Sequence, residues 1–167
     1  MLDYSRSAPI IDPELVPNIH LIGCGSVGST IALGLAKMGI QNVTLYDFDI
    51  IEEHNVSNQM FGIKDVGKLK TETLRNIILD NTGIDYDIVS SRVEKGTKFN
   101  GIVFLIVDSL KTRLDIFRSQ INNFQCLGII DTRTAVWDAR CYYANPNEPI
   151  HKKKYQESLV NAEEIDA

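Results

Sequence analysis

Three glycines in the segment 23–28, Gly-Cys-Gly-Ser-Val-Gly, have the G-x-G-x-x-G spacing that can bind the phosphates of a nucleotide. In such a turn the first glycine permits a tight bend, the second lets the backbone approach a phosphate, and the third lets a helix pack closely on the sheet. A helix beginning here would direct free N–H groups and the positive end of its dipole at the phosphates. We therefore expect nucleotide contacts at Gly23, Gly25, Ser26 and Gly28, the alternative being a turn that serves packing alone.

A carboxylate, Asp47, follows the second predicted strand, where an acidic residue accepts hydrogen bonds from a ribose in folds of this kind. The adenosine ribose of NAD, FAD or ATP satisfies such a carboxylate equally well. The turn and Asp47 together therefore indicate an adenine nucleotide without saying which one. Asp49 is either a second acidic contact or a cap for the following turn.

The stretch after this carboxylate carries neutral amides and lysines, for which an NAD enzyme has no obvious need. Amides can hydrogen-bond to phosphate oxygens and ribose, and an ammonium group offsets the charge that develops when pyrophosphate leaves an α-phosphate. This composition favours a triphosphate. The residues concerned are Asn55, Asn58, Gln59, Lys68 and Lys70.

The elements that would position these residues alternate between short apolar runs and helical periodicities, which predicts an α/β fold with a mainly parallel sheet. Strands are expected over residues 18–23, 42–47, 85–91, 101–108 and 126–131, with an edge strand over 139–146, and helices over 26–38, 68–83 and 110–124. Residues 48–66 show no clear period, and we expect an ordered loop with a short helix. The fold predicted is a Rossmann-like, doubly wound α/β sheet with flanking helices. We expect a single domain over 1–167, with a core over about 18–146 and a polar tail over 147–167 that is a surface helix or partly disordered.

Composition excludes several classes of function. The chain has 167 residues, 44% of them hydrophobic, and a net charge of −5, which argues against a nucleic-acid-binding surface. No stretch approaches the ~20 apolar residues of a membrane helix, and the first 15 residues lack the basic and apolar regions of a secretion signal. Three cysteines without paired spacing predict neither a disulfide framework nor a zinc site. We expect a cytoplasmic protein without nucleic-acid or membrane partners.

Five sequence elements, in order across residues 18 to 131, resemble the ThiF/MoeB/HesA family of adenylating enzymes, relatives of the ubiquitin-activating enzymes. They are the glycine turn 23–28, Asp47-Phe48-Asp49, Asn55-Val56-Ser57-Asn58-Gln59, Gly67-Lys68-Leu69-Lys70, and Asp108-Ser109 with Arg113. The resemblance implies an enzyme that binds Mg-ATP and the Gly-Gly-type C-terminal tail of a ubiquitin-like or sulfur-carrier protein. The tail carboxylate would attack the α-phosphate, giving an acyl-adenylate and pyrophosphate.

The same resemblance implies roles for individual residues. Asp47 would hold the ribose, while Asn55, Gln59 and Lys70 would line the phosphates. Asp108 would ligate Mg²⁺, an ion that suits a carboxylate combined with phosphate oxygens. The segment Asp-Tyr-Ser-Arg at 3–6 resembles the start of family members in which an arginine reaches the nucleotide of the other subunit. Arg6 is thus expected to be catalytic together with Lys70 and Asp108, in a homodimer.

The chain departs from the family pattern at two positions. Asn58 stands where most activating members have an arginine, and an amide supplies none of the charge of a guanidinium. Ser109 replaces the usual asparagine. Two other functions therefore stay open: a nucleotide-binding scaffold or regulatory subunit without full activity, and an NAD-binding Rossmann domain.

Other reactive or bulky side chains are expected to be structural. Cys24, Cys126 and Cys141 lack the setting of a thioester-forming nucleophile. His20 is expected to be a satisfied core or edge histidine, and His54 could face the nucleotide. Trp137 is expected to anchor packing rather than to serve as a platform for a peptide. Arg133 either orients a substrate carboxylate or forms a salt bridge.

Overall fold

The computed structural model describes residues 3, 11–135 and 137–165. They divide into an N-terminal unit, which ends at Arg92, and a C-terminal unit, which begins at Val93. The single domain expected over 1–167 stays a prediction.

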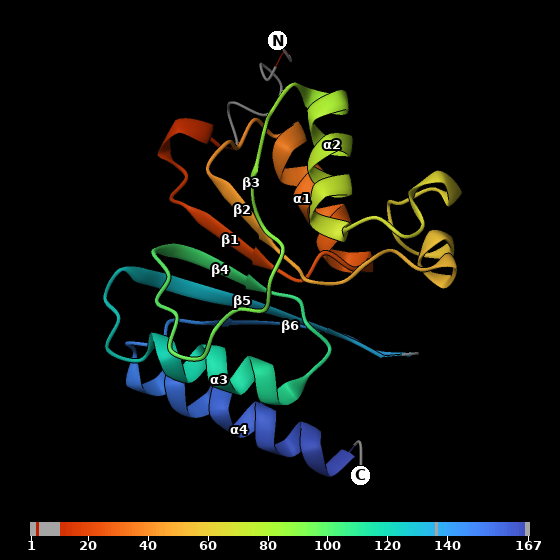
Figure 1. The fold of residues 1–167 in the computed structure, drawn as a ribbon. Coiled ribbons are helices and arrows are strands. Elements are labelled where there is room, and N and C mark those ends of the chain that lie inside the picture. Colours follow the sequence, from red (N-terminus) through yellow and green to blue (C-terminus); the bar gives the residue numbers. More distant parts are fainter. Residues whose placement is uncertain (1–2, 4–10, 136, 166–167) are drawn as a thin grey trace. The chain divides into compact units, whose positions relative to one another are not determined.

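The N-terminal unit contains three parallel strands in the order β3-β2-β1, joined through helices (Figure 1). In register, Ile19 lies opposite Val43 and Thr44 opposite Asp87. The elements are η1 (Pro13–Leu15), β1 (Ile19–Ile22), α1 (Ser26–Lys37), β2 (Val43–Tyr46), η2 (Glu53–Ser57), η3 (Ile63–Asp65), α2 (Lys70–Thr82) and β3 (Asp87–Val89). The predicted strands and helices of this region are confirmed, with bounds shifted by a few residues.

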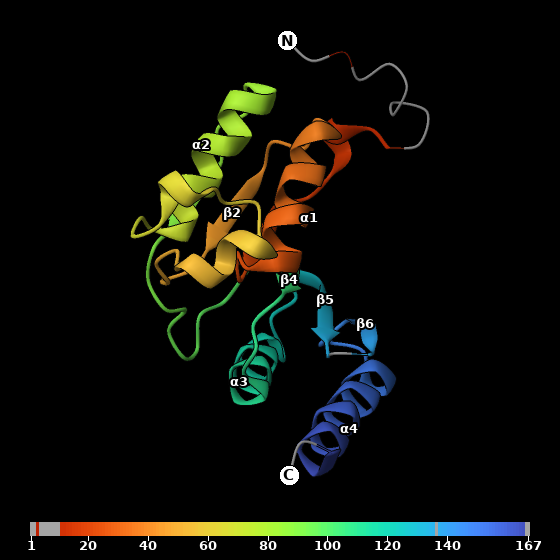
Figure 2. The same cartoon turned by 90° about the vertical axis from the view of Figure 1, so that its right-hand side faces the viewer.

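Glycines set the bounds of both α-helices in this unit. Gly39, with φ of 87°, follows the end of α1, and Gly83, with φ of 75°, caps α2 in the left-handed conformation by donating its N–H to Leu79 O at 2.8 Å. The two helices lie side by side over one face of the three strands (Figures 1 and 2). Between them and the sheet lies an apolar core that includes Leu21, Leu45, Leu74 and Ile78, all without exposed surface.

The segment between β2 and α2 is an ordered loop that contains the two 3-10 helices η2 and η3, as its lack of periodicity predicted. Met60 N–H donates to the Ser29 hydroxyl at 3.4 Å, which places this segment against the first turn of α1 (Figure 2). The loop also pairs with the start of α2 through an antiparallel bridge between Ile50 and Leu69. It is therefore held at two points beside the glycine turn.

The C-terminal unit contains β4 parallel to β5, and β6 antiparallel to β5 at the edge. Its helices α3 and α4 pack against each other on one side of the strands (Figure 1). The elements are β4 (Gly101–Leu105), α3 (Leu110–Gln120), β5 (Cys126–Thr134), β6 (Ala139–Ala144) and α4 (Pro149–Ile165). Of the two alternatives for the polar tail, the structure shows a helix, which buries Tyr155 and Leu159.

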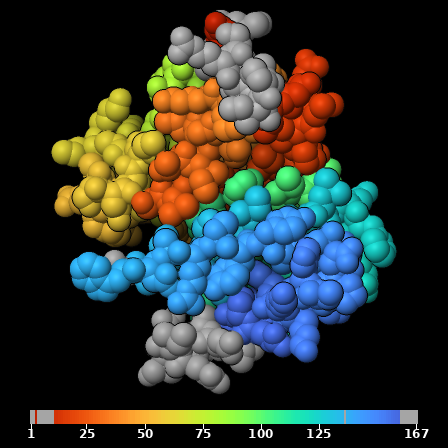
Figure 3. Space-filling view, turned by 180° about the vertical axis from the view of Figure 1, so that it is seen from behind, coloured from red at the N-terminus to blue at the C-terminus, as the bar shows by residue number. Residues whose placement is uncertain are grey.

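Two predictions for this unit are wrong. The helix expected over 110–124 ends at Gln120, because Asn122 adopts a left-handed conformation with φ of 62° and Phe124 is 80% exposed. Trp137, expected to anchor packing, is 97% exposed between β5 and β6. These two strands belong to the blue part of the surface in Figure 3. A hairpin tip offers a side chain few neighbours, whatever its hydrophobicity.

Among the helices of the described residues, none combines the length and the apolar character needed to cross a bilayer. The alternation of parallel strands with helices matches the predicted class in both units.

Candidate nucleotide site

The glycine turn between β1 and α1 has the geometry of a phosphate-binding turn. Gly23 has φ of 102°, which favours glycine. A Cβ on Gly28 would lie 1.9 Å from the Gly23 carbonyl oxygen, so α1 approaches the turn at a distance only glycine permits. Among the described residues, a Cβ on Gly25 would meet nothing within 4 Å, and no side chain caps α1, where Ser26 is exposed. Space and N–H donors for an anion therefore coincide at Gly25.

Asp47 fastens this turn to the end of β2. Its Oδ2 accepts the Cys24 backbone N–H at 2.7 Å, and its Oδ1 accepts the Asp49 N–H at 2.9 Å. The side chain is half-buried, and each carboxylate oxygen has a second lone pair. Asp47 can therefore position the turn and still accept a hydrogen bond from a ribose hydroxyl.

The two predicted lysines have different settings. Lys70, the first residue of α2, is buried, and its Nζ lies 3.0 Å from Asp49 Oδ2, while its N–H donates to Asp49 O at 3.0 Å. Lys68 is half-exposed and pairs with Asp65, three residues before it, at 2.9 Å. Of the two ammonium groups, that of Lys70 is the one paired with Asp49, two residues after Asp47, which makes Lys70 the better candidate for a phosphate contact.

The amides of η2 also differ in their surroundings. Asn55 is 5% exposed, and its Oδ1 accepts the Glu52 N–H at 2.9 Å, so this oxygen caps η2. Gln59 Oε1 is buried and has no hydrogen-bond partner among the described residues. An unpaired buried acceptor is costly, and a ligand hydroxyl or water would satisfy it. Asn58, in the position of the family's arginine, is exposed at the end of η2. His54 is exposed as well and lies 3.5 Å from Glu52.

Asp108 follows β4 in the C-terminal unit and is exposed, with no hydrogen bond or ion pair among the described residues. Its neighbour Ser109 caps α3 by accepting the Thr112 N–H at 3.2 Å, a role that serine fills as well as asparagine. The described residues contain no group of three His, Cys, Asp or Glu side chains that could hold a metal ion alone. The single carboxylate of Asp108 fits an ion such as Mg²⁺, which proteins bind through one or two carboxylates together with phosphate oxygens and water.

Arg113, on α3, is buried beneath the loop between β4 and α3. The family pattern includes this arginine, but the sequence assigns it no role. Its guanidinium donates to the carbonyls of Leu105, Val107 and Thr132, and to a carboxylate oxygen of Asp131, which has no exposed surface. Arg113 thereby fixes the backbone directly before Asp108. Burial lowers the pKa of Arg113 to about 10, so the side chain is still charged at neutral pH.

Asp131 is the centre of a buried cluster that sequence reasoning missed. Its Oδ2 accepts from Arg133 Nε at 2.9 Å and from the Tyr155 hydroxyl at 2.8 Å. Arg133 also donates to the carbonyl oxygen and the hydroxyl of Ser158 in α4. The salt-bridge alternative for Arg133 therefore holds, and the cluster fastens α4 to β5. Its one sequence signal is an aspartate at the end of an apolar strand.

The cysteines differ in exposure. Cys24 and Cys126 are buried, as expected of structural residues, whereas Cys141 is exposed on β6. Burial, and then the charge of Asp47, raise the pKa of the Cys24 thiol well above its usual value, and burial raises the pKa of Cys126 to about 11. Both buried thiols are therefore protonated at neutral pH. His20, in β1, is half-buried, and its Nδ1 lies 3.0 Å from the Tyr46 hydroxyl, so it is a hydrogen-bonded structural histidine.

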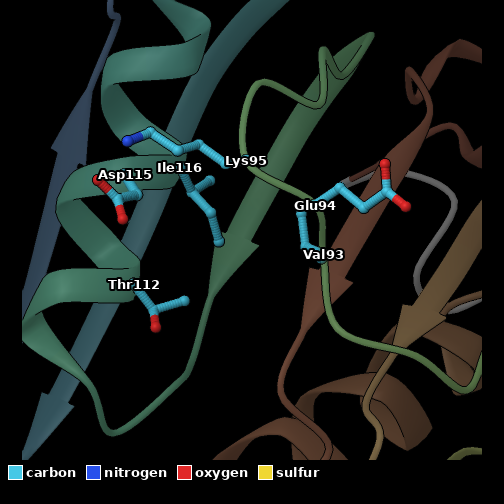
Figure 4. Close-up of a pocket in the computed structure, with 6 residues that line it drawn as sticks. All are labelled: Val93, Glu94, Lys95, Thr112, Asp115 and Ile116. Atoms are coloured by element: carbon cyan, nitrogen blue, oxygen red, sulfur yellow. The ribbon is translucent and has the colours of Figure 1, made fainter.

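A hollow of about 90 Å³ in the C-terminal unit involves none of the predicted site residues. Figure 4 shows its lining, which comes from the loop before β4 and from α3: Val93, Glu94, Lys95, Thr112, Asp115 and Ile116. Arg6 lies outside the described residues. The candidate site of the N-terminal unit therefore consists of the turn, Asp47, Asp49, Gln59 and Lys70. Asp108 belongs to the C-terminal unit, and its place in a nucleotide site stays a prediction.

Residues 17–161 match the model of the ThiF family. Ubiquitin-like modifier-activating enzyme 5 of Oryza sativa subsp. japonica is 29% identical over 119 residues, which make up 68% of this chain and 28% of that protein. The probable adenylyltransferase/sulfurtransferase MoeZ of Mycobacterium tuberculosis is 35% identical over 62 residues, 36% of this chain and 16% of MoeZ. The chain thus spans under a third of the length of either relative.

Solved structures of E. coli MccB share the fold. A complex with ATP has a TM-score of 0.67 at 20% identity and covers 95% of this chain and 55% of that one. A complex with AMPCPP and MccA has a TM-score of 0.68 at 20% identity, over 87% of this chain and 47% of that one. This similarity confirms the Rossmann-like α/β class.

Proposed function

This chain belongs to the ThiF family, and on that premise we propose that it binds ATP and adenylates a C-terminal carboxylate of a ubiquitin-like or sulfur-carrier protein. The observation that carries the proposal is a hydrogen bond between two predicted binding elements, the glycine turn and Asp47. The Cys24 N–H, next to the open position at Gly25, donates to the Asp47 carboxylate. This hydrogen bond joins the groups that would donate to phosphate and the carboxylate that would accept from ribose, which supports the proposal.

The N-terminal unit would bind the nucleotide. The free N–H groups at the start of α1 would receive phosphate oxygens, and Asp47 would accept a ribose hydroxyl. Gln59 Oε1, buried without a partner among the described residues, would accept another hydroxyl, and the Asn58 amide would lie at the edge of the site. Lys70, whose ammonium is already oriented by Asp49, would face a phosphate.

In the reaction, an oxygen of the substrate carboxylate attacks the α-phosphorus of ATP. A new P–O bond forms while the bond from the α-phosphorus to the bridging oxygen breaks, and pyrophosphate leaves with that electron pair. Lys70 would stabilise the charge that develops on the phosphate oxygens. The carboxylate nucleophile is ionised at neutral pH, so no general base is needed.

Asp108 would hold Mg²⁺ together with phosphate oxygens, and the ion would neutralise charge on the leaving pyrophosphate. The exposed carboxylate, which has no hydrogen bond or ion pair within 4.0 Å among the described residues, is available for this role. Arg113 would keep the Asp108 backbone in place through the carbonyl of Val107.

The substrate proposed is a protein or peptide carboxylate, as the names of the relatives indicate: one activates a ubiquitin-like modifier, one is an adenylyltransferase/sulfurtransferase, and MccB was solved with MccA. A Gly-Gly-type tail is our expectation for the carrier. We also propose a homodimer in which Arg6 of one subunit reaches the nucleotide of the other.

ATP–pyrophosphate exchange with labelled pyrophosphate, Mg²⁺ and Gly-Gly-tailed candidate proteins tests the proposal. We expect exchange that depends on the carboxylate partner and disappears in Asp108→Asn. The matched control Asp115→Asn, which changes a carboxylate on α3, should retain it. Exchange that survives in Asp108→Asn would remove this residue from the metal site.

The exposed amide of Asn58, where the family has an arginine, supports one second candidate, a nucleotide-binding scaffold. Calorimetry separates it from the first: ATP bound with no exchange for any carboxylate partner indicates the scaffold. Binding of NAD in preference to ATP would overturn both.

A further inference from the structure

Phe48 and Arg92 form an exposed stacked pair beside the candidate nucleotide site. The guanidinium carbon of Arg92 lies 3.9 Å from the centroid of the Phe48 ring, and Phe48 is 43% exposed. Arg92 is also exposed and has no carboxylate within 4.0 Å among the described residues. An apolar ring and an unpaired planar cation are thus both presented to solvent.

The backbone directs this pair to the ligand-binding edge of the sheet. The Asp49 N–H donates to Asp47 Oδ1, which closes a short turn with Phe48 at its centre. Arg92 lies three residues after the end of β3, which runs parallel to β2, and Asp47 N–H donates to Val89 O at 3.2 Å. Ligands of open α/β sheets bind at this carboxyl edge of the strands.

The order of groups along a nucleotide narrows the role of the pair. If the phosphates lie at the glycine turn and the ribose at Asp47, the base extends past Asp47, away from the phosphates. Phe48 is the next residue after Asp47, and Arg92, stacked on it, belongs to the segment that follows β3, so both come after the carboxyl ends of these two strands. Aromatic rings and guanidinium planes are the side-chain surfaces on which nucleobases stack.

We propose that Phe48 and Arg92 form the surface on which the adenine ring of ATP stacks, and that this pair makes the site selective for purine nucleotides. The inference rests on the proposed function, because it assigns the base of the same nucleotide. It adds two specificity-determining residues to the phosphate and ribose contacts. The competing interpretation is a cation–π pair that only stabilises the surface of the loop.

Calorimetric titration with three probes tests this: ATP, CTP, and ribose 5-triphosphate, which has the phosphates and sugar without the base. Stacking energies predict that Phe48→Ala and Arg92→Ala each weaken ATP binding by about fivefold or more. Binding of ribose 5-triphosphate should change by less than about twofold, within the scatter expected for an unaffected contact. Wild-type protein should bind ATP more tightly than CTP, and both variants should lose part of this preference.

Conservative variants and matched controls separate stacking from charge and from folding. Phe48→Tyr keeps the ring and should bind ATP like wild type. Arg92→Lys keeps the positive charge but loses the planar guanidinium, and it should weaken ATP binding as Arg92→Ala does. Phe124→Ala and Arg118→Ala remove an exposed ring and an exposed guanidinium from the C-terminal unit and should leave all three affinities unchanged.

Three results would overturn the inference. Unchanged ATP affinity in Phe48→Ala would assign the pair to loop stability alone. If Arg92→Ala weakened the binding of ATP and of ribose 5-triphosphate equally, and Arg92→Lys restored both affinities, Arg92 would act as a charge that attracts the phosphates. Wild-type protein that binds no ATP would overturn the proposed function and this inference together, whereas the first two results leave the proposed function intact.

Discussion

Asp47 Oδ2 and the backbone nitrogen of Cys24 lie 2.7 Å apart, so the carboxylate at the end of β2 holds the glycine turn that follows β1. The residue predicted to bind ribose is thus also part of the frame of the phosphate-binding turn. Loss of the carboxylate should disturb both the fold and the site, and the two effects can be measured separately.

For Asp47→Asn, we expect the free energy of unfolding to fall by about 1–2 kcal/mol, because two backbone N–H groups lose a charged acceptor. ATP affinity should fall as well. Urea unfolding and calorimetry measure the two effects. Asp87→Asn is the control, since the exposed Asp87 carboxylate on β3 accepts no hydrogen bond from the described residues. The free energy of unfolding of this variant should change by less than about 0.5 kcal/mol. Equal changes in the two variants would contradict the framing role of Asp47.

Two glycines of the same helix should respond in opposite directions to alanine. Gly28→Ala places a Cβ 1.9 Å from the Gly23 carbonyl oxygen, so we expect a loss of about 2 kcal/mol or more in the free energy of unfolding. Gly34→Ala meets no atom within 4 Å and should stabilise α1 by about 0.5–1 kcal/mol. Thermal or urea unfolding of both variants and of wild type measures these changes in the free energy of unfolding. A Gly28→Ala protein as stable as wild type would show that α1 does not pack closely on the turn.

The two lysines of the 67–70 element should be separable by kinetics. Lys70→Ala should reduce ATP–pyrophosphate exchange by about 100-fold or more, because a preorganised cation near the phosphates is lost. Lys68→Ala should stay close to wild type, since Lys68 is half-exposed and paired with Asp65. If Lys68→Ala were the more damaging change, the phosphate contact would belong to Lys68.

Much of the N-terminal unit follows from local sequence. The glycine turn, the apolar runs on either side and Gly83 predict β1, α1, β2 and α2 to within a few residues, because backbone conformation there depends on glycine and on periodicity. The end of α3 depends instead on distant groups. Gln120 accepts the Phe99 N–H at 3.0 Å and Asn123 donates to the Phe99 carbonyl at 2.7 Å, which favours a turn where the apolar spacing predicts another helical turn.

The candidate site was predictable as a set of residues, and the contacts among them were not. Motif spacing indicated Asp47 and Lys70, but nothing in the spacing shows that Asp49 orients Lys70. The Asp131 cluster joins α3, β5 and α4 through charged and polar side chains, and Asp131 is separated in sequence by 18 positions from Arg113 and by 24 from Tyr155. Periodicity carries no information on such pairings. The sequence therefore singles out Arg113 only as part of the family pattern and does not predict its ion pair with Asp131.

Tyr155 in this cluster should make stability depend on alkaline pH. Burial raises the pKa of its hydroxyl from 10 to about 12, so the folded protein keeps the proton at pH values where the unfolded chain loses it. The unfolded state then binds fewer protons, and stability falls as pH rises. The contribution of the protonated Tyr155 hydroxyl to the free energy of unfolding is complete below pH 10 and is lost between pH 10 and pH 12. Its size is roughly 2–3 kcal/mol.

Tyr155→Phe should therefore reduce the decline of the free energy of unfolding between pH 10 and 12, which urea unfolding at a series of pH values measures against wild type. At pH 7 the variant should be less stable by about 1 kcal/mol, because Asp131 loses the hydroxyl at 2.8 Å. Tyr143→Phe removes a hydroxyl from a tyrosine that is 59% exposed and should keep the wild-type pH dependence. If Tyr155→Phe and wild type declined in parallel over this range, the Tyr155 hydroxyl would not be buried against Asp131, and α4 would not be fastened to β5 in the way the structure shows.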